Sequence, residues 1–384
     1  MLMYELKKIV NNRVNRALFA AVVVLAVVFS GFAISSFQFV DSSSETHTGI
    51  SAARSLVADK NQWQGELTPE TISTIATKES STDWQSRSDI IYLTSEMLVG
   101  EFSEFDDYKA VLSAEPSQIA SIYDIYQENL RVMSHEYGDT PAKAQYLQKQ
   151  YDAIETPFYY EAYDSWDTML LYGTTFSLIL IIVISFITSG IFADEFRNHA
   201  DAVFFSTTYG RSKAIRTKIF AGLIITTGVY WAGIALLSAI SFAVMGVSGA
   251  DTAYQFSQPY AVYSVTFSQM YGLVLVGGFV ASLLSASICM LVASRTRKMS
   301  LAVAVPFVLF FVSPFVGRAL PFLTFFTLTP DQLTNIMNCA RIPYIYEIGG
   351  AVFRQIPFIL VLYTVVAVVL LPLVHRSYSR TMAQ

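Results

Sequence analysis

The acidic pair Asp194-Glu195 directly follows a long apolar stretch and opens a segment whose other charged residues are mostly basic. Adjacent carboxylates bind cationic groups through charge-assisted hydrogen bonds. A short apolar run with Phe204 and Phe205 follows, and then a turn with Arg211. The segment has 25 residues, whereas a plain connector needs about 4–6. These features predict either a docking surface for a basic partner or a surface helix without a partner.

The sequence carries none of the common motifs for catalysis or for binding of nucleotide phosphates. It has no G-x-x-x-x-G-K-[ST] loop, no G-x-G-x-x-G, no H-E-x-x-H and no G-x-S-x-G nucleophile elbow. Its two cysteines exclude a disulfide framework and a cysteine-rich zinc site. The four histidines are scattered along the chain, at His47, His135, His199 and His375. We therefore expect no enzyme activity, no metal and no cofactor held by this chain.

The elements that must position these residues are membrane-spanning helices. Hydrophobic residues make up 53% of the chain and charged residues 14%, whereas a soluble chain carries about a quarter charged residues. Six stretches are long enough to cross a hydrocarbon core of about 30 Å, which needs about 20 helical residues. They cover residues 17–40, 168–193, 219–247, 262–293, 301–317 and 352–374. The fifth contains Pro306 and Pro314, which predict an interrupted helix.

The distribution of basic residues predicts the orientation of the spans. With the N-terminus inside, the inner segments hold 14 of the 25 lysines and arginines but only four of the 30 acidic residues. The positive-inside rule places such segments in the cytoplasm. We expect a multi-pass protein of a bacterial cell membrane with both termini cytoplasmic and the first span retained as an anchor. The inner segments are residues 1–16, 194–218, 294–300 and 375–384.

Residues 41–167 form the predicted extracellular domain, which lies between the first two spans and carries most of the acidic residues. Capping and turn signals predict that this domain is mostly helical. The predicted boundaries are helix starts at Thr68-Pro69-Glu70, Ser117 and Thr140-Pro141, and a helix end at Gly138. The fold class is therefore an all-α integral membrane protein with a mostly helical domain outside.

Two further segments border the predicted outer surface of the membrane. Five aromatic residues before the second span form either an aromatic belt at the headgroup level or the lining of a substrate portal. They are Phe158, Tyr159, Tyr160, Tyr163 and Trp166. The segment 318–350 is rich in apolar residues and too long for a turn. We expect it to be extracellular or re-entrant, with a short helix after its Thr-Pro-Asp sequence.

Two helical patterns concern packing rather than catalysis. In the first 16 residues, apolar side chains recur at helical spacing opposite Lys7 and Lys8, which predicts an amphipathic helix at the inner interface or a plain basic anchor. In the fourth span, Gly277, Ala281 and Ser285 recur at every fourth position. Small residues at this spacing let two helices approach closely in lipid, either within the bundle or between subunits.

The order of these elements resembles the permease subunits of ABC exporters with the type V fold, the ABC-two class. The resemblance covers the spans and the inner loops but not the domain of residues 41–167, so it implies no substrate. In that family the inner loop after the second span holds a coupling helix that docks on a separate ATP-binding subunit. The corresponding residues here are Ile191-Phe192-Ala193-Asp194-Glu195, Tyr209-Gly210-Arg211-Ser212-Lys213 and Lys218.

The resemblance implies a subunit of an ATP-driven exporter that binds ABC ATPase subunits, a second permease and membrane lipid, but no nucleic acid. ATP would be bound by the partner subunit. Asp194, Glu195 and Arg211 would contact the ATPase, and Phe204 and Phe205 would pack into its surface groove. The alternative is a membrane-anchored receptor or assembly factor whose outer domain binds a ligand without transport. A membrane-embedded enzyme is the least favoured function, because no span or outer loop offers a catalytic set of residues.

Overall fold

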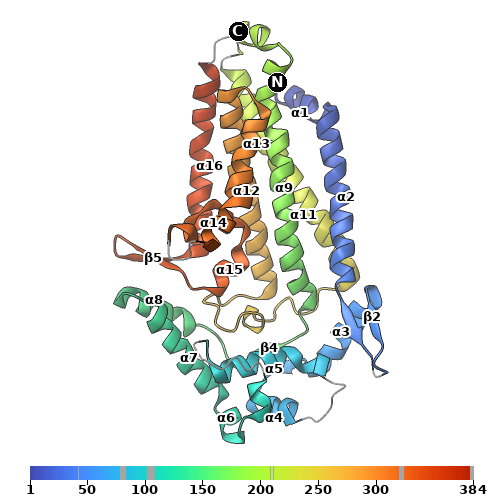
Figure 1. Ribbon diagram of the computed structural model, residues 1–384, viewed down its shortest axis with the longest axis vertical. Helices are drawn as coiled ribbons and strands as arrows, with labels where there is room; N and C mark the ends of the chain where they lie inside the picture. The colour runs from blue at the N-terminus through green and yellow to red at the C-terminus, as the bar shows by residue number, and fades with distance from the viewer. Residues whose placement is uncertain are drawn as a thin grey trace.

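Long apolar helices run side by side through most of the length of the molecule (Figure 1). The computed structural model describes residues 1–41, 43–77, 84–101, 109–207, 209–210, 212–319 and 324–380. Within these residues, six helices are long and apolar enough to cross a membrane, as predicted for an all-α membrane protein. They are α2 (Arg13–Ser35), α9 (Asp164–Arg197), α11 (Lys213–Met245), α12 (Phe267–Thr296), the helical run Met299–Gly317 and α16 (Gln355–Ser379).

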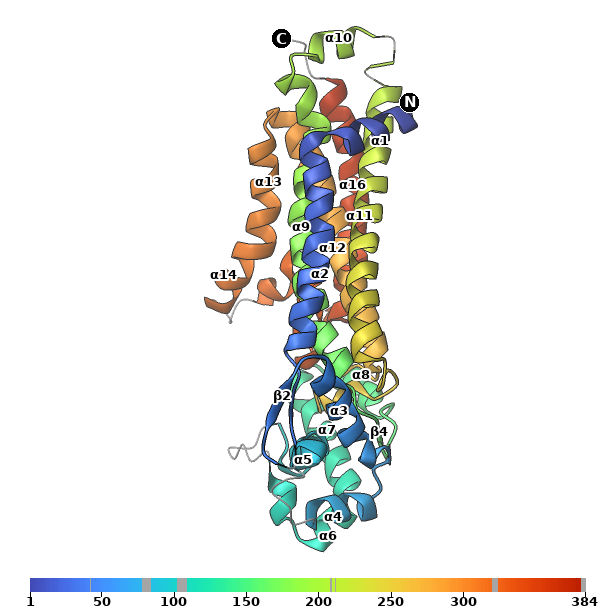
Figure 2. The ribbon, with the colours of Figure 1, turned by 90° about the vertical axis from the view of Figure 1, so that its right-hand side faces the viewer.

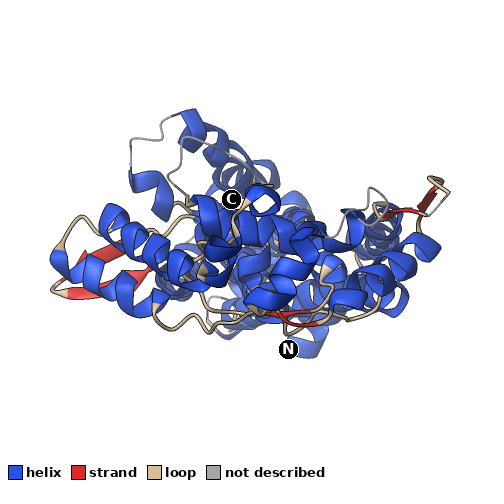
Figure 3. Cartoon of the chain, turned by 90° about the horizontal axis from the view of Figure 1, so that it is seen from below, coloured by secondary structure: helices blue, strands red, loops and turns tan. Residues whose placement is uncertain are grey.

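Both ends of the chain lie at one end of the helix bundle, which we call the terminal end (Figure 1). The domain of residues 41–163 lies at the opposite end, which we call the domain end. Figure 3 looks along the bundle from the domain end and shows how little strand the molecule contains. Within the described residues, the strands form three antiparallel pairs, β1 (Gln38–Val40) with β2 (Thr46–Thr48), β3 (Gly65–Glu66) with β4 (Tyr159–Tyr160), and β5 (Ile345–Ile348) with β6 (Ala351–Arg354).

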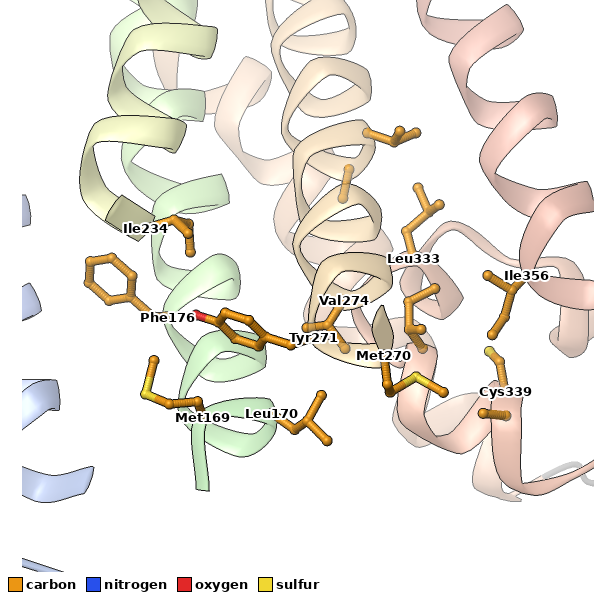
Figure 4. Close-up of a cluster of buried hydrophobic side chains, with 14 of the residues drawn as sticks. Met169, Leu170, Phe176, Ile234, Met270, Tyr271, Val274, Leu333, Cys339 and Ile356 are labelled. Carbon is orange, nitrogen blue, oxygen red and sulfur yellow. The ribbon is translucent and has the colours of Figure 1, made fainter. Parts of the chain in front are cut away.

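Helices α9 and α12 form the centre of the bundle. The most apolar window of α9 is 72% buried and that of α12 is 67% buried, whereas the corresponding windows of α2 and α16 are 22% and 17% buried. Figure 4 shows buried side chains of both helices in this core, among them Leu170 of α9 and Tyr271 and Val274 of α12. The outer helices therefore keep large apolar faces that a lipid bilayer would cover.

The fifth span is interrupted, as its two prolines predict. It consists of α13 (Met299–Phe307), a π-helical turn η4 (Val308–Val312) and α14 (Ser313–Ala319). Pro306 lies at the end of α13 and cannot donate a backbone hydrogen bond. Prolines and single π-helical turns are both known causes of interruptions in α-helices. Figure 2 shows α13 and α14 at the edge of the bundle.

The ends of several spans differ from the sequence prediction. The fourth helix begins at Phe267 rather than at Val262, because Thr266 and Gln269 form a capping box there. Residues 38–40 and 352–354 were expected in spans but belong to the short strand pairs. Helices α9 and α11, in contrast, extend beyond their apolar stretches into polar sequence. Hydropathy marks the lipid-facing part of a helix, whereas caps and packing determine where it ends.

The domain of residues 41–163 is mostly helical, as predicted. Thr140 caps its last helix by accepting a hydrogen bond from the Lys143 N–H, and the expected helix ends at Gly138. The predicted start at Ser117 is one residue late, since Pro116 begins a short helix. The helices are α3 (Ile50–Lys60), α4 (Pro69–Thr77), α5 (Trp84–Val99), α6 (Pro116–Ala120), α7 (Ile122–Tyr137) and α8 (Pro141–Tyr151), with 3₁₀ turns η1 (Asn61–Trp63) and η2 (Ala110–Ser113).

Aromatic side chains join this domain to the bundle. The Phe256 ring, in the 3₁₀ turn η3 (Tyr254–Phe256), lies 6.0 Å from the Phe158 ring, 5.3 Å from Tyr160 and 5.8 Å from Tyr163. All four side chains are buried. The predicted roles of residues 158, 160 and 163 as a headgroup belt or portal lining are therefore wrong, because these rings fill the junction between the domain and the loop before α12.

A buried lysine makes a second connection at the same junction. The Lys60 ammonium at the end of α3 lies 2.7 Å from Asp89 of α5 and 2.6 Å from Asp164 at the start of α9. Tyr160 donates a hydrogen bond to Asp89. Burial by itself would lower the pKa of Lys60, but the two carboxylates raise it above its ordinary value. The ammonium therefore stays charged and holds the domain against α9.

The segment between the last two spans packs back against the bundle. Its apolar residues Leu333, Ile336 and Cys339 are buried, and Figure 4 shows Leu333 and Cys339 between α12 and α16. The expected short helix is present as two consecutive pieces. The segment contains η5 (Thr324–Leu328), η6 (Pro330–Thr334) and α15 (Ile336–Arg341).

The small residues of α12 contact other helices of the same chain. A methyl group added at Gly277 would lie 2.8 Å from Cγ1 of Ile336 and also against the backbone oxygen of Leu333. Ala281 and Ser285 are fully buried, and the Ser285 hydroxyl lies 2.6 Å from that of Ser185 on α9. An interface with a second copy of the chain would therefore need a different surface.

We expect Gly277→Ala to lower the thermal stability of the purified protein, because overpacking a filled contact costs about 1–3 kcal/mol. Gly228→Ala is the matched control, since a methyl group there meets nothing within 4 Å and alanine favours a helix by about 0.5–1 kcal/mol. Thermal unfolding in mild detergent should separate the two variants. Equal melting temperatures would contradict the close contact at Gly277.

Candidate functional site

The residues that the sequence singled out gather at the terminal end of the bundle. There α1 (Leu2–Asn11) lies across the ends of α9 and α11, and α10 (Asp201–Ser206) projects beyond them (Figure 2). Asn12 ends α1 and its side chain accepts a hydrogen bond from the Val14 N–H, which begins α2. The chain therefore turns sharply from the amphipathic helix into the first span.

Four charged side chains form what we call the Lys218 ion cluster, which consists of Glu5, Lys8, Glu195 and Lys218. The Lys218 ammonium lies 2.6 Å from the Glu195 carboxylate and donates a hydrogen bond to the Ile191 carbonyl at 2.9 Å. Lys8 lies 2.7 Å from the same Glu195 oxygen, and Glu5 lies 3.7 Å from Lys218. One carboxylate thus joins α1, α9 and α11.

Burial differs sharply within this cluster. The Lys218 side chain is 0% exposed and that of Glu195 is 6% exposed, whereas that of Lys8 is 41% exposed. Burial would lower the pKa of Lys8, but the Glu195 carboxylate raises it above its ordinary value. Removal of one partner from a buried ion pair leaves an uncompensated charge. The Lys218–Glu195 pair is therefore the interaction on which this end of the bundle depends.

Five rings form a second group, the Tyr378 aromatic cluster, made of Phe192, Phe196, Phe204, Phe205 and Tyr378. The Tyr378 ring of α16 lies 4.9 Å from Phe192, 5.9 Å from Phe204 and 5.1 Å from Phe205. Phe196 and Phe205 are 6.2 Å apart. These aromatic contacts attach α10 to α9 and to the last span.

The structure gives two of the predicted contact residues a role inside the chain. Glu195 and Phe205 are each only 5% exposed, so their side chains hold the segment in place rather than face a partner. Asp194 is half-buried and forms an ion pair with Arg197 at 2.9 Å, and Phe204 is half-buried in the aromatic cluster. Arg211 lies outside the described residues.

The exposed apolar residues of this segment were not identified from the sequence. Val203 on α10 is 70% exposed and Tyr209 is 56% exposed. Helical periodicity was a usable signal for Val203, because a short amphipathic helix that buries Phe204 and Phe205 must turn another side outward. Lys218 was named only through the family resemblance, and Tyr378 was not named. Their contacts carried no local signal, since their partners Glu195 and Phe205 are distant along the chain.

The described residues offer one group with metal-ligand chemistry, Asp41, Glu45 and His47 in the β1–β2 hairpin. The Asp41 carboxylate already accepts hydrogen bonds from Ser43 and from the Glu45 N–H, and it lies 2.9 Å from His47 Nε2. Hydrogen bonds from Ser43 and His47 hold the pKa of Asp41 well below its usual range. These bonds account for the arrangement as a hairpin turn without an ion.

A large cavity lies at the domain end. It has a volume of about 1110 Å³ and is lined by α7, α8 and the tip of the β5–β6 hairpin, including Gly350 and Val352. The Thr140 hydroxyl donates a hydrogen bond to Glu347 of that hairpin at 2.7 Å. The segment between the last two spans therefore contacts the domain directly.

Comparison of the chain with protein-family models, with curated proteins and with solved structures finds no match. A function can therefore be inferred only from the geometry of the two clusters and of the exposed segment between them.

We expect Lys218→Met to destabilise the protein by about 3–5 kcal/mol, because it leaves Glu195 buried with only a half-exposed partner. Lys8→Met should cost about 1 kcal/mol or less, since solvent screens that side chain. Denaturant unfolding in mild detergent measures both. Equal losses for the two variants would show that burial of Lys218 does not determine the stability of the cluster.

Proposed function

We propose that the chain is the transmembrane permease subunit of an ATP-driven ABC exporter, and that the segment 194–218 receives force from a separate ATPase subunit. The observation that supports this proposal most strongly is the combination of an exposed α10 with its firm attachment to the spans. Val203 is 70% exposed, while residues on both sides of it are held by the two clusters.

In this mechanism, each cluster transmits a displacement of α10 to different helices. A displacement of α10 would pass to α16 through Tyr378, which contacts both phenylalanines of α10. It would pass to α9, α11 and α1 through Glu195, whose carboxylate contacts Lys8 and Lys218. Packed cores shift between discrete arrangements rather than deform continuously. Repeated ATPase closure would thus switch the bundle between two packings with opposite access.

The proposed roles of individual residues follow from their exposure. Val203 and Tyr209 would form the apolar contact with the ATPase, with Asp194 and Arg197 at its polar edge. Glu195 and Phe205 would keep α10 in register with the spans. A second permease and lipid would cover the apolar outer faces of the bundle, and ATP would bind to the partner alone.

The decisive experiment is purification of the tagged chain from its native host in mild detergent. We expect a stoichiometric partner with a G-x-x-x-x-G-K-[ST] motif. Val203→Glu should weaken retention of that partner by more than about tenfold, because it places a charge in an apolar contact. Val132→Glu is the control, since Val132 is an exposed valine on α7 at the domain end. Absence of an ATPase partner, or equal retention by both variants, would contradict the proposal.

The proposed orientation has its own test. The native cysteines are buried, with Cys289 at 0% and Cys339 at 2% exposure, and burial raises the pKa of the Cys339 thiol to about 12. A membrane-impermeant maleimide should therefore label Val132→Cys in intact cells, and Val203→Cys only after permeabilisation. The reverse pattern would place the termini outside.

A receptor or assembly factor is the alternative, and the cavity of about 1110 Å³ on the domain favours it. Cavities of this size accommodate a small ligand or a short peptide. If the purified chain carries an outer partner and no ATPase, Gln145→Trp, which narrows the cavity, should release that partner. Retention by this variant would exclude the cavity as the binding site.

A further inference from the structure

A second cavity lies between α11 and α16 at the terminal end of the bundle. It has a volume of about 360 Å³, which is within the range of small-molecule sites. Both helices are candidate membrane spans with large apolar faces, since their most apolar windows are only 33% and 17% buried. The cavity therefore opens on a surface that faces lipid if the helices cross a membrane.

The lining of this cavity changes from polar to apolar along the helix axes. Arg216 lies near the start of α11, and His375 lies near the end of α16. Because the two helices run in opposite directions, these two side chains lie at the same level, nearest the terminal end. The apolar residues Phe220, Leu223 and Leu371 line the part farther from that end.

Charge distinguishes this cavity from an ordinary gap between helices. Arg216 is exposed and has no carboxylate partner in the part of the chain that the structure describes. The described lining contains no acidic side chain. A cationic guanidinium above an apolar slot matches a phosphate joined to a hydrocarbon chain. Basic sites between spanning helices bind anionic lipid headgroups in this way.

We propose that the cavity between α11 and α16 binds an anionic phospholipid, with its phosphate on Arg216 and the start of an acyl chain along Phe220 and Leu223. The site lies at the same level along the helices as both clusters described above. Arg216 is two residues before Lys218 in α11, and His375 is three residues before Tyr378 in α16. A lipid bound here would therefore hold together the ends of the two helices that carry these anchoring residues.

Lipid titration of the full-length protein, followed by native mass spectrometry, tests the proposal. Phosphatidylglycerol and phosphatidylcholine with identical acyl chains are the probes. The protein should bind phosphatidylglycerol about fivefold more tightly, which is the contribution of one basic residue near a membrane surface. Arg216→Gln should abolish this preference. Arg376→Gln is the matched control, because Arg376 is exposed on the same end of α16 but does not line the cavity.

A second variant separates the cavity from general surface charge. Leu223→Trp fills the apolar part and should weaken binding of both lipids while Arg216 remains. An equal loss of preference in Arg376→Gln would overturn the proposal in favour of diffuse attraction. Displacement of the lipid by inorganic phosphate alone would assign the site to free phosphate. If the protein forms dimers and Leu223→Trp dissociates them, the cavity would instead be an interface between copies of the chain.

Discussion

The buried ion pair between Lys218 and Glu195 is the interaction on which the terminal end of the molecule depends. A fully buried ammonium costs several kcal/mol unless a carboxylate and further acceptors surround it. Lys218 has both, since Glu195 and the Ile191 carbonyl lie within 2.9 Å. These groups come from the last turns of α9, so α9 and α11 must meet there. Lys8 shares the same carboxylate and thereby fixes the position of α1.

A corresponding pair lies at the other end of α9. Its first residue, Asp164, contacts the buried Lys60 of the domain, and its last turns carry Glu195. This 34-residue helix is about 50 Å long and is held by a buried lysine at each end. Helix α9 therefore connects the domain to the segment 194–218 as one rigid element, which is the property that the proposed transmission requires.

Between these ends the bundle is held by close packing rather than by charge. Gly277 allows η6 and α15 to approach α12, and the Ser185 and Ser285 hydroxyls share a hydrogen bond. Such contacts leave no strong single interaction to break when helices slide. Ion pairs hold the two ends of α9, and small residues pack the helices between these ends. This combination suits a bundle that alternates between two packings. The cavity beneath Arg216 lies between α11 and α16, near the end of the bundle that the Lys218 ion cluster holds.

The sequence by itself determined the six spans, because each needs about 20 apolar residues to satisfy its backbone in lipid. It also determined the helix starts at Pro69 and Pro141, since capping is local chemistry. The capping box at Thr266 was equally local, but the apolar residues before it concealed the boundary. Only the tertiary structure decided that Glu195 and Phe205 face inward. Their partners Lys218 and Tyr378 come from other helices, and no short-range pattern encodes which distant side chains will meet.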